Sequence, residues 1–127
     1  MIRNSPLGDR IEQLYGDSRA FDTAPYAKSM DYIFVDADHS YDGIKNDTTK
    51  AFEMLRPGGV IVWHDYAGKS PGVYRFIKEF SQQRPVFRIR STCLIVYLDG
   101  VDAGTFVPAP LPECLEDTEY GPGGARL

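Results

Sequence analysis

The apolar residues of the chain fall into short runs separated by polar or glycine-rich stretches. Two of these runs, at residues 32–35 (Tyr-Ile-Phe-Val) and 60–63 (Val-Ile-Val-Trp), are continuously apolar and of strand length. Unbroken apolar runs of this length are typical of strands that are covered on both faces, as in parallel sheets. We therefore predict two buried, parallel strands at these positions.

The segment between the two predicted strands has the spacing of an amphipathic helix. Between residues 42 and 55 the apolar positions recur every three or four residues, at Ile44, Ala51, Phe52 and Leu55. Pro57 cannot continue a helix interior, and the glycines that follow it permit a left-handed turn, so the helix should end there. The result is a strand, helix, strand unit, in which both strands end at the same edge of the sheet.

Three further elements complete the predicted fold. An i, i+3, i+4, i+7 stripe over residues 73–80 indicates a second amphipathic helix, and residues 86–89 and 93–98 predict an antiparallel hairpin. The half-apolar segment Ile11–Tyr15 predicts a short strand that runs into a turn. We expect an α/β domain over residues 1–98 and a Pro/Gly-rich tail over 99–127 with little regular structure.

Length and charge narrow the classes of function. A chain of 127 residues has room for one ordinary domain, and its 43% hydrophobic and 25% charged content is that of a soluble globular protein. The net charge of −4 argues against a nucleic-acid surface, which is usually basic. The first ten residues lack the apolar stretch of a signal peptide, and no apolar run is long enough to span a membrane. These features predict a cytoplasmic protein that acts on a small molecule.

Ionisable side chains follow both predicted parallel strands. Asp36, Asp38 and His39 come directly after the first strand, and His64 and Asp65 follow the second. If the strands are neighbours, their ends lie about 5 Å apart, so the two groups should line one crevice. Carboxylates and imidazoles in a common cleft predict a ligand or catalytic site. Asp38 and Ser40 also have an alternative role, because short polar side chains are favoured as helix caps.

The run from Asp31 to Asp47, with its DADHSY motif, and the run from Leu55 to Tyr66, with PGG and HDY, resemble class I S-adenosylmethionine-dependent methyltransferases of the small-molecule O-methyltransferase-like kind. The Gly-Asp-Ser triplet at residues 16–18 adds to the resemblance, which covers about residues 11–98. It implies a Rossmann-like sheet of strand order 3-2-1-4-5-7-6, of which this chain would carry the third to the seventh strand. The family's glycine-rich cofactor loop has no counterpart ahead of Ile11, so the chain resembles a truncated, carboxyl-side part of that sheet.

The resemblance also implies roles for individual residues. S-adenosylmethionine would be bound by residues that follow the third and fourth strands of the family's sheet: Asp17, Ser18, Asp36, Ala37 and His39. His39 or His64 would accept the proton of the substrate. In the metal-dependent branch of the family, the positions of Asp36, His64 and Asp65 hold a divalent cation such as magnesium.

Two other functions remain open at this stage. The absence of the family's first two strands would expose the edge of the strand at residues 32–35, so either the Ile11 segment or another chain, as in a homodimer, should pair with it. The chain would then be a non-catalytic oligomerisation module, inactive when isolated. The third possibility is a metal-dependent enzyme without a methyl donor, built on the clustered Asp and His residues.

Overall fold

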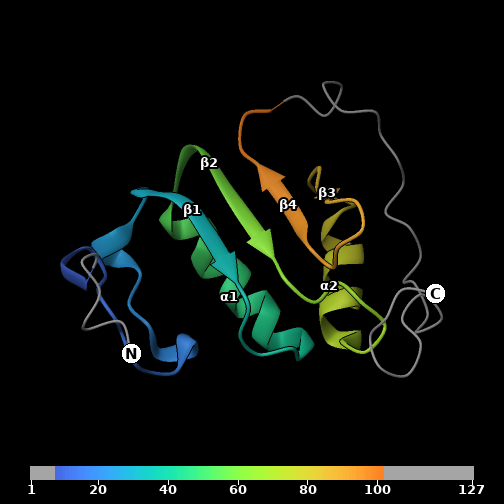
Figure 1. Cartoon of the computed structure of the whole chain (residues 1–127), viewed down its shortest axis with the longest axis horizontal. Helices are drawn as coiled ribbons and strands as arrows, with labels where there is room; N and C mark the ends of the chain where they lie inside the picture. Colours follow the sequence, from blue (N-terminus) through green and yellow to red (C-terminus); the bar gives the residue numbers. More distant parts are fainter. Residues whose placement is uncertain (1–7, 102–127) are drawn as a thin grey trace.

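The computed structural model describes residues 8–101 and contains one open sheet with two helices. Three single-turn 3-10 helices (Gly8–Arg10, Ser18–Ala20 and Ala24–Tyr26) lead into strand β1 (Met30–Val35), helix α1 (Tyr41–Met54) and strand β2 (Leu55–Trp63). Helix α2 (Pro71–Phe80) and the strands β3 (Phe87–Arg88) and β4 (Ile95–Leu98) follow. Figure 1 shows both helices behind the sheet.

The sheet has the order β1-β2-β4-β3, and it confirms the predicted α/β topology. β1 and β2 run parallel, with Val35 opposite Trp63, and both contacts of β4 are antiparallel. This order corresponds to the 4-5-7-6 part of the sheet that the sequence resemblance implied. β2 begins at Leu55, earlier than predicted, because Leu55 already pairs with Met30 across an irregularity in the register.

The hydrophobic core lies between the two helices and one face of the sheet. Its largest fully buried side chain is Trp63, surrounded by Ile61, Ile77 and Ile95. The indole Nε1–H donates a hydrogen bond of 2.9 Å to the hydroxyl of the buried Thr48 on α1. A buried donor without a partner is costly, so this bond fixes how α1 sits on β2.

The other face of the sheet is uncovered among the described residues, which contradicts the prediction that β1 is buried on both faces. Tyr32 and Phe34 are 57% and 47% exposed. Both helices pack against the opposite face, where Ile33 is partly buried and Val35 is buried. An unbroken apolar run was therefore a poor guide to burial here.

The segment Ile11–Tyr15 is not a strand, so the prediction of a strand there was wrong. The segment does not pair with β1, whose only partner in the described part of the chain is β2. Its apolar side chains Ile11 and Leu14 are 45% and 53% exposed, which leaves the segment without the burial that would hold it in the sheet. Most of the predicted Pro/Gly-rich tail lies outside the described residues.

No helix within residues 8–101 is both long and apolar enough to cross a lipid bilayer.

Candidate functional site

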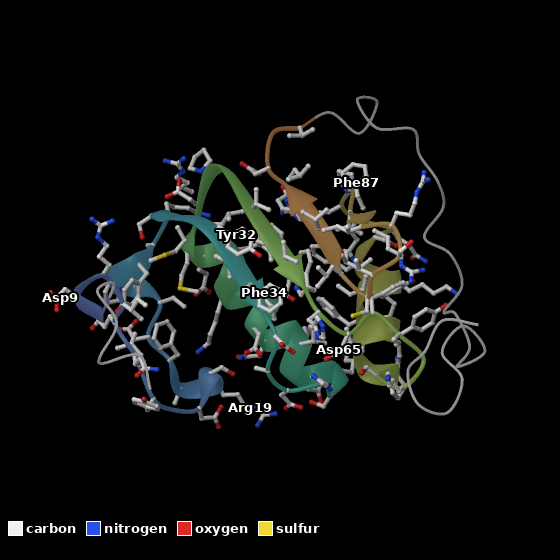
Figure 2. The ribbon with its side chains drawn as sticks, viewed as in Figure 1. Asp9, Arg19, Tyr32, Phe34, Asp65 and Phe87 are labelled. Carbon is white, nitrogen blue, oxygen red and sulfur yellow. The ribbon has the colours of Figure 1, made fainter. Side chains whose placement is uncertain are left out.

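The carboxyl ends of β1 and β2 bring the two predicted groups of ionisable residues together. The backbone N–H of His64 donates a hydrogen bond of 3.1 Å to the carbonyl oxygen of Val35, so the two chain segments leave the sheet side by side. Asp36 follows directly in one segment and Asp65 in the other. Figure 2 shows Asp65 just beyond the end of β2. The predicted convergence is confirmed, whereas the catalytic roles of these residues stay predictions.

Asp65 lies at the centre of the cluster. Its Oδ2 is 2.9 Å from Nε2 of His39 and 3.0 Å from Nδ1 of His64. Oδ1 of Asp36 lies further away, 3.8 Å and 3.6 Å from the same two nitrogens. We call these four residues, Asp36, His39, His64 and Asp65, the strand-end cluster. One carboxylate oxygen thus faces two imidazoles.

The backbone at Asp65 turns sharply to make this arrangement. Its φ angle is +61°, in the left-handed region that only a few per cent of non-glycine residues adopt. Aspartate tolerates this region better than most residues, and such conformations often occur at functional sites. The turn directs the carboxylate back towards the imidazole of the preceding residue.

The two ring nitrogens of His64 have different surroundings. Nδ1 is buried and has no hydrogen-bond partner, although two carboxylate oxygens lie near it. Nε2 lies 3.4 Å from Sγ of Cys93, which belongs to the loop before β4. The ring of Phe34 packs at a tilt against the same imidazole, with 6.2 Å between centroids. His64 is therefore held between carboxylates, a thiol and an aromatic ring.

Asp38 has a structural role in this conformation. Its carboxylate accepts hydrogen bonds from the backbone N–H and the hydroxyl of Ser40 and from Nη2 of Arg19, at 2.9, 3.0 and 2.7 Å. The bonds from Ser40, followed by the charge of Arg19, lower the pKa of the Asp38 carboxyl. Ser40 is the helix cap, since its hydroxyl oxygen accepts from the N–H of Gly43.

The residues predicted to hold the cofactor are only partly brought together. Asp36 and His39 lie in the strand-end cluster, and Ala37 is an exposed residue between them. Asp17 caps the 3-10 helix that starts at Ser18, by accepting a hydrogen bond from the backbone of Arg19. This segment reaches the loop after β1 through the Arg19–Asp38 ion pair. No contact found within the described ranges joins Asp17 or Ser18 to Asp36.

Two glycines allow the loop after β1 to pack closely. A β-carbon on Gly43 would lie 2.5 Å from the carboxylate of Asp38, and one on Gly72 would lie 2.3 Å from the carbonyl oxygen of His39. Real β-carbons essentially never come so near another atom. Helix α2 therefore begins directly against the backbone that carries His39.

Three residues near the cluster were not singled out in the sequence: Arg19, Gly72 and Cys93. For Cys93 the signal lies in the register of β4 against β2, because the antiparallel pair of Trp63 with Ile95 places residue 93 opposite residue 65 when it continues by two residues. Arg19 and Gly72 have no such signal, because their contacts depend on how loops far apart in the chain pack together.

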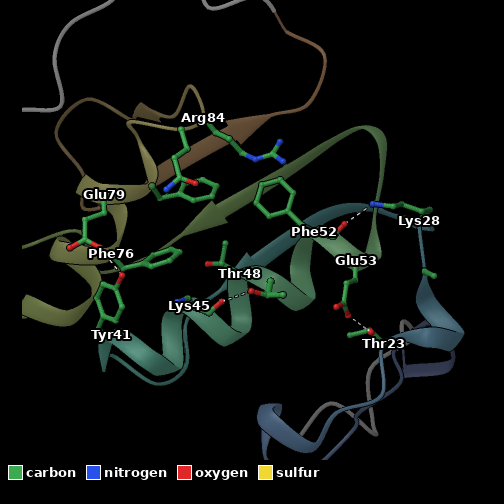
Figure 3. A pocket seen from close by; sticks show the side chains of 14 residues that line it. Thr23, Lys28, Tyr41, Lys45, Thr48, Phe52, Glu53, Phe76, Glu79 and Arg84 are labelled. Atoms are coloured by element: carbon green, nitrogen blue, oxygen red, sulfur yellow. Dashed lines mark hydrogen bonds between the residues drawn. The ribbon is translucent and has the colours of Figure 1, made fainter.

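A separate groove of about 810 Å³ lies on the helical side of the sheet (Figure 3). Helices α1 and α2 supply most of its wall, with Phe52, Phe76 and Phe80 among the lining side chains. None of the residues of the strand-end cluster lines it. The candidate site is thus an open edge of the sheet that is distinct from this groove.

Comparison with known families gives one match. A family model described as a methyltransferase domain matches residues 1–66, just over half of the chain. The matched region ends directly after the His64-Asp65 pair and includes β1, α1 and β2. No curated protein matches the chain.

Proposed function

Because the chain belongs to the methyltransferase domain family, we propose that it takes part in methyl transfer from S-adenosylmethionine to a hydroxyl or amine of a small molecule. The observation that carries the proposal is the pair of imidazoles around one carboxylate: His39 and His64 both lie within 3.0 Å of Oδ2 of Asp65. Imidazole is the side chain most often used as a general base. The geometry supports proton removal from an acceptor group at this edge.

The charge of the strand-end cluster suits the cofactor. When bound, S-adenosylmethionine supplies a methyl group on a positively charged sulfonium. Asp36 and Asp65 place two carboxylates at the edge, and the side chain of Asp36 is 42% exposed. Carboxylates near a cation favour its binding, most strongly where water is partly excluded. Asp17, Ser18 and Ala37 remain proposed cofactor contacts.

In this proposal, the chain's own residues orient the acceptor and remove its proton. His39 has a half-exposed side chain, so it can meet an acceptor that approaches from solvent. Asp65 would hold the imidazole of His39 in place. Most of the rate enhancement would come from the alignment of acceptor and methyl donor, because positioning can lower a bimolecular barrier by about 7–11 kcal/mol.

Calorimetric titration with S-adenosylmethionine tests the cofactor site, because the proposed role of Asp36 depends on the charge of the sulfonium. We expect binding by the wild-type chain and at least tenfold weaker binding by Asp36→Asn, a loss of about 1.4 kcal/mol. Asp22→Asn is the matched control, because asparagine keeps the side-chain oxygen that accepts from the backbone of Ala24. No heat at millimolar ligand, or equal binding by Asp36→Asn and wild type, would contradict the proposal.

The predicted magnesium ligands Asp36, His64 and Asp65 fit that ion incompletely. Oδ1 of Asp36 and Oδ2 of Asp65 lie 3.6 and 3.0 Å from the buried Nδ1 of His64. Magnesium, however, prefers oxygen ligands, and here one of the three donors is an imidazole nitrogen. No step of the proposed reaction depends on magnesium.

A second candidate function is self-association through β1, which the exposure of Tyr32 and Phe34 favours. The edge of β1 that has no neighbouring strand among residues 8–101 offers unpaired backbone groups to another strand. A second copy that pairs antiparallel about Ile33 would bring Tyr32 opposite the partner's Phe34, and aromatic cross-strand pairs stabilise sheets. The two copies would form one continuous sheet.

Sedimentation velocity over a range of concentrations tests this association. We expect a dimer for the wild type and a monomer for Tyr32→Lys, because lysine on an edge strand opposes pairing. Ile89→Lys is the control, since Ile89 is 42% exposed and lies outside β1. A wild-type chain that stays monomeric at all concentrations would refute self-association through β1.

A further inference from the structure

The contact between Cys93 and His64 belongs to neither proposal above. Sγ of Cys93 lies 3.4 Å from Nε2 of His64, whereas Oδ1 of Asp36 and Oδ2 of Asp65 lie 3.6 and 3.0 Å from Nδ1 of the same ring. The backbone holds Cys93 in this place, because the N–H of Tyr66 donates a hydrogen bond of 3.0 Å to the carbonyl oxygen of Cys93. The thiol, in the loop before β4, thus faces the imidazole of the residue that directly follows β2.

Asp65 completes a set of three donors of different kinds. One ligand atom from each of His64, Asp65 and Cys93 lies within 4.8 Å of the other two. In a tetrahedral zinc site, bonds of about 2.3 Å to sulfur and 2.0–2.1 Å to nitrogen place these two atoms about 3.6 Å apart. The observed separation of 3.4 Å is close to that value. Little movement is needed to bring both atoms onto one ion.

The other face of His64 has the surroundings of a metal-bound histidine. Its Nδ1 is buried, has no hydrogen-bond partner and lies 3.6 Å from Oδ1 of Asp36. A histidine that binds a metal through one nitrogen usually donates its other N–H to a carboxylate or a carbonyl, which fixes the ring. Ligation at Nε2 would leave the proton on Nδ1. Once the Asp65 carboxylate, whose Oδ2 lies 3.0 Å from Nδ1, turns onto the ion, Asp36 is the carboxylate that can accept this proton.

We propose that Cys93, His64 through Nε2, and Asp65 form a site for a zinc-class transition-metal ion. Thiolate and imidazole donors favour zinc, cobalt and similar ions over magnesium. On binding, the Cys93 thiol gives up its proton to solvent and its sulfur bonds to the ion, with no change of oxidation state. Three protein ligands leave one tetrahedral position for water or a substrate oxygen.

This site differs from the magnesium site that the sequence resemblance implied. It uses the opposite nitrogen of His64, it includes a sulfur ligand, and Asp36 becomes a positioning residue. The inference does not rest on methyl transfer, so binding of the metal and binding of the cofactor can succeed or fail separately.

Cobalt substitution tests the proposal on the full, reduced chain. We expect Co²⁺ to produce a thiolate-to-cobalt charge-transfer absorption in the near ultraviolet and the visible bands of four-coordinate cobalt. Cys93→Ser should abolish the charge-transfer absorption and weaken binding more than tenfold. Cys114→Ser, which alters the other cysteine of the chain, should leave the charge-transfer absorption and the affinity for cobalt unchanged. Asp36→Asn should keep the absorption and weaken binding about 10–100-fold.

Two results would overturn the site: no charge-transfer absorption in the wild type, or an absorption that survives in Cys93→Ser. If the Cys93 variants do not fold, as judged by circular dichroism, X-ray absorption of the zinc-loaded wild type decides instead. A single Zn–S contribution at about 2.3 Å supports the site, and a spectrum without a sulfur ligand contradicts it. Excess magnesium should not displace the bound cobalt, and displacement would favour the oxygen-ligand site.

Discussion

Gly72 lies directly against the backbone of His39, with space at position 72 for a hydrogen but not for a side chain. A β-carbon there would lie 2.3 Å from the carbonyl oxygen of His39 and 2.6 Å from the backbone nitrogen of Tyr41. The atoms it would meet are backbone atoms, so the clash cannot be relieved by turning a side chain. The start of α2 therefore positions the loop that carries His39.

We expect Gly72→Ala to lower the free energy of unfolding by about 1–3 kcal/mol, the usual cost of overpacking. The displaced loop should also weaken the binding of S-adenosylmethionine. Urea unfolding and calorimetric titration measure the two effects. Gly16→Ala is the control, because a β-carbon at Gly16 meets no atom within 4 Å. Equal stability of wild type and Gly72→Ala would show that the loop can move away.

The shared contact of Asp65 with two imidazoles leads to a prediction about turnover. We expect His39→Gln to lower kcat for methyl transfer by about 10²-fold or more, since a positioned general base contributes about 10²–10⁴-fold. Cofactor binding is titrated in parallel, because the sequence resemblance also makes His39 a cofactor contact, and a lower kcat at saturating cofactor then reports the loss of the base. Steady-state assays with phenol and amine acceptors provide the measurement. An unchanged kcat, together with an unchanged pH–rate profile, would remove His39 from the mechanism.

Removing the buried hydrogen bond between Trp63 and Thr48 should lower the free energy of unfolding even when the volume of the side chain at position 48 is kept. Thr48→Val keeps the shape of the side chain but leaves the indole N–H of Trp63 without its acceptor. A buried donor without a partner costs about 1–3 kcal/mol. The exposed neighbour Thr49 is the control, and Thr49→Val should change the unfolding free energy by no more than about 0.5 kcal/mol. Thermal and urea unfolding of both variants would show the difference.

The hydrogen bonds of Asp38 predict a dependence of stability on pH. They lower the pKa of Asp38 in the folded state below the unfolded value of about 3.9. The carboxylate therefore stabilises the fold above that value, and its contribution is lost as the pH falls through the lowered folded pKa. We expect a flatter acid limb of the stability curve in Asp38→Asn than in the wild type. Parallel acid limbs in urea titrations would contradict this.

The sequence predicted the elements whose signals are local. The helical spacing from Ile44 to Leu55 and the Pro-Gly-Gly turn located α1 and the bend after it, and the period-two pattern located the hairpin. The two parallel strands then placed the strand-end cluster, because neighbouring parallel strands must end at the same edge. The sequence alone was thus enough to predict that the ionisable residues at the ends of these two strands lie together.

What the sequence could not predict depends on contacts between distant segments. The apolar run at Tyr32–Val35 is compatible with a strand that is covered on one face or on both. Only the position of the helices in the structure shows that Tyr32 and Phe34 are exposed. The segment at Ile11 has the composition of a strand, but no strand in the described part of the chain pairs with it. The approach of Cys93 to His64 follows from the register of β4 against β2, which the hydrophobic pattern alone does not fix.

The packing of Phe34 against His64 links the bare side of the sheet to the chemistry at its end. Any polypeptide that settles over Phe34 would also remove water from around the imidazole, and every electrostatic interaction of the cluster would gain strength. Assembly over this face would then strengthen the interactions within the strand-end cluster.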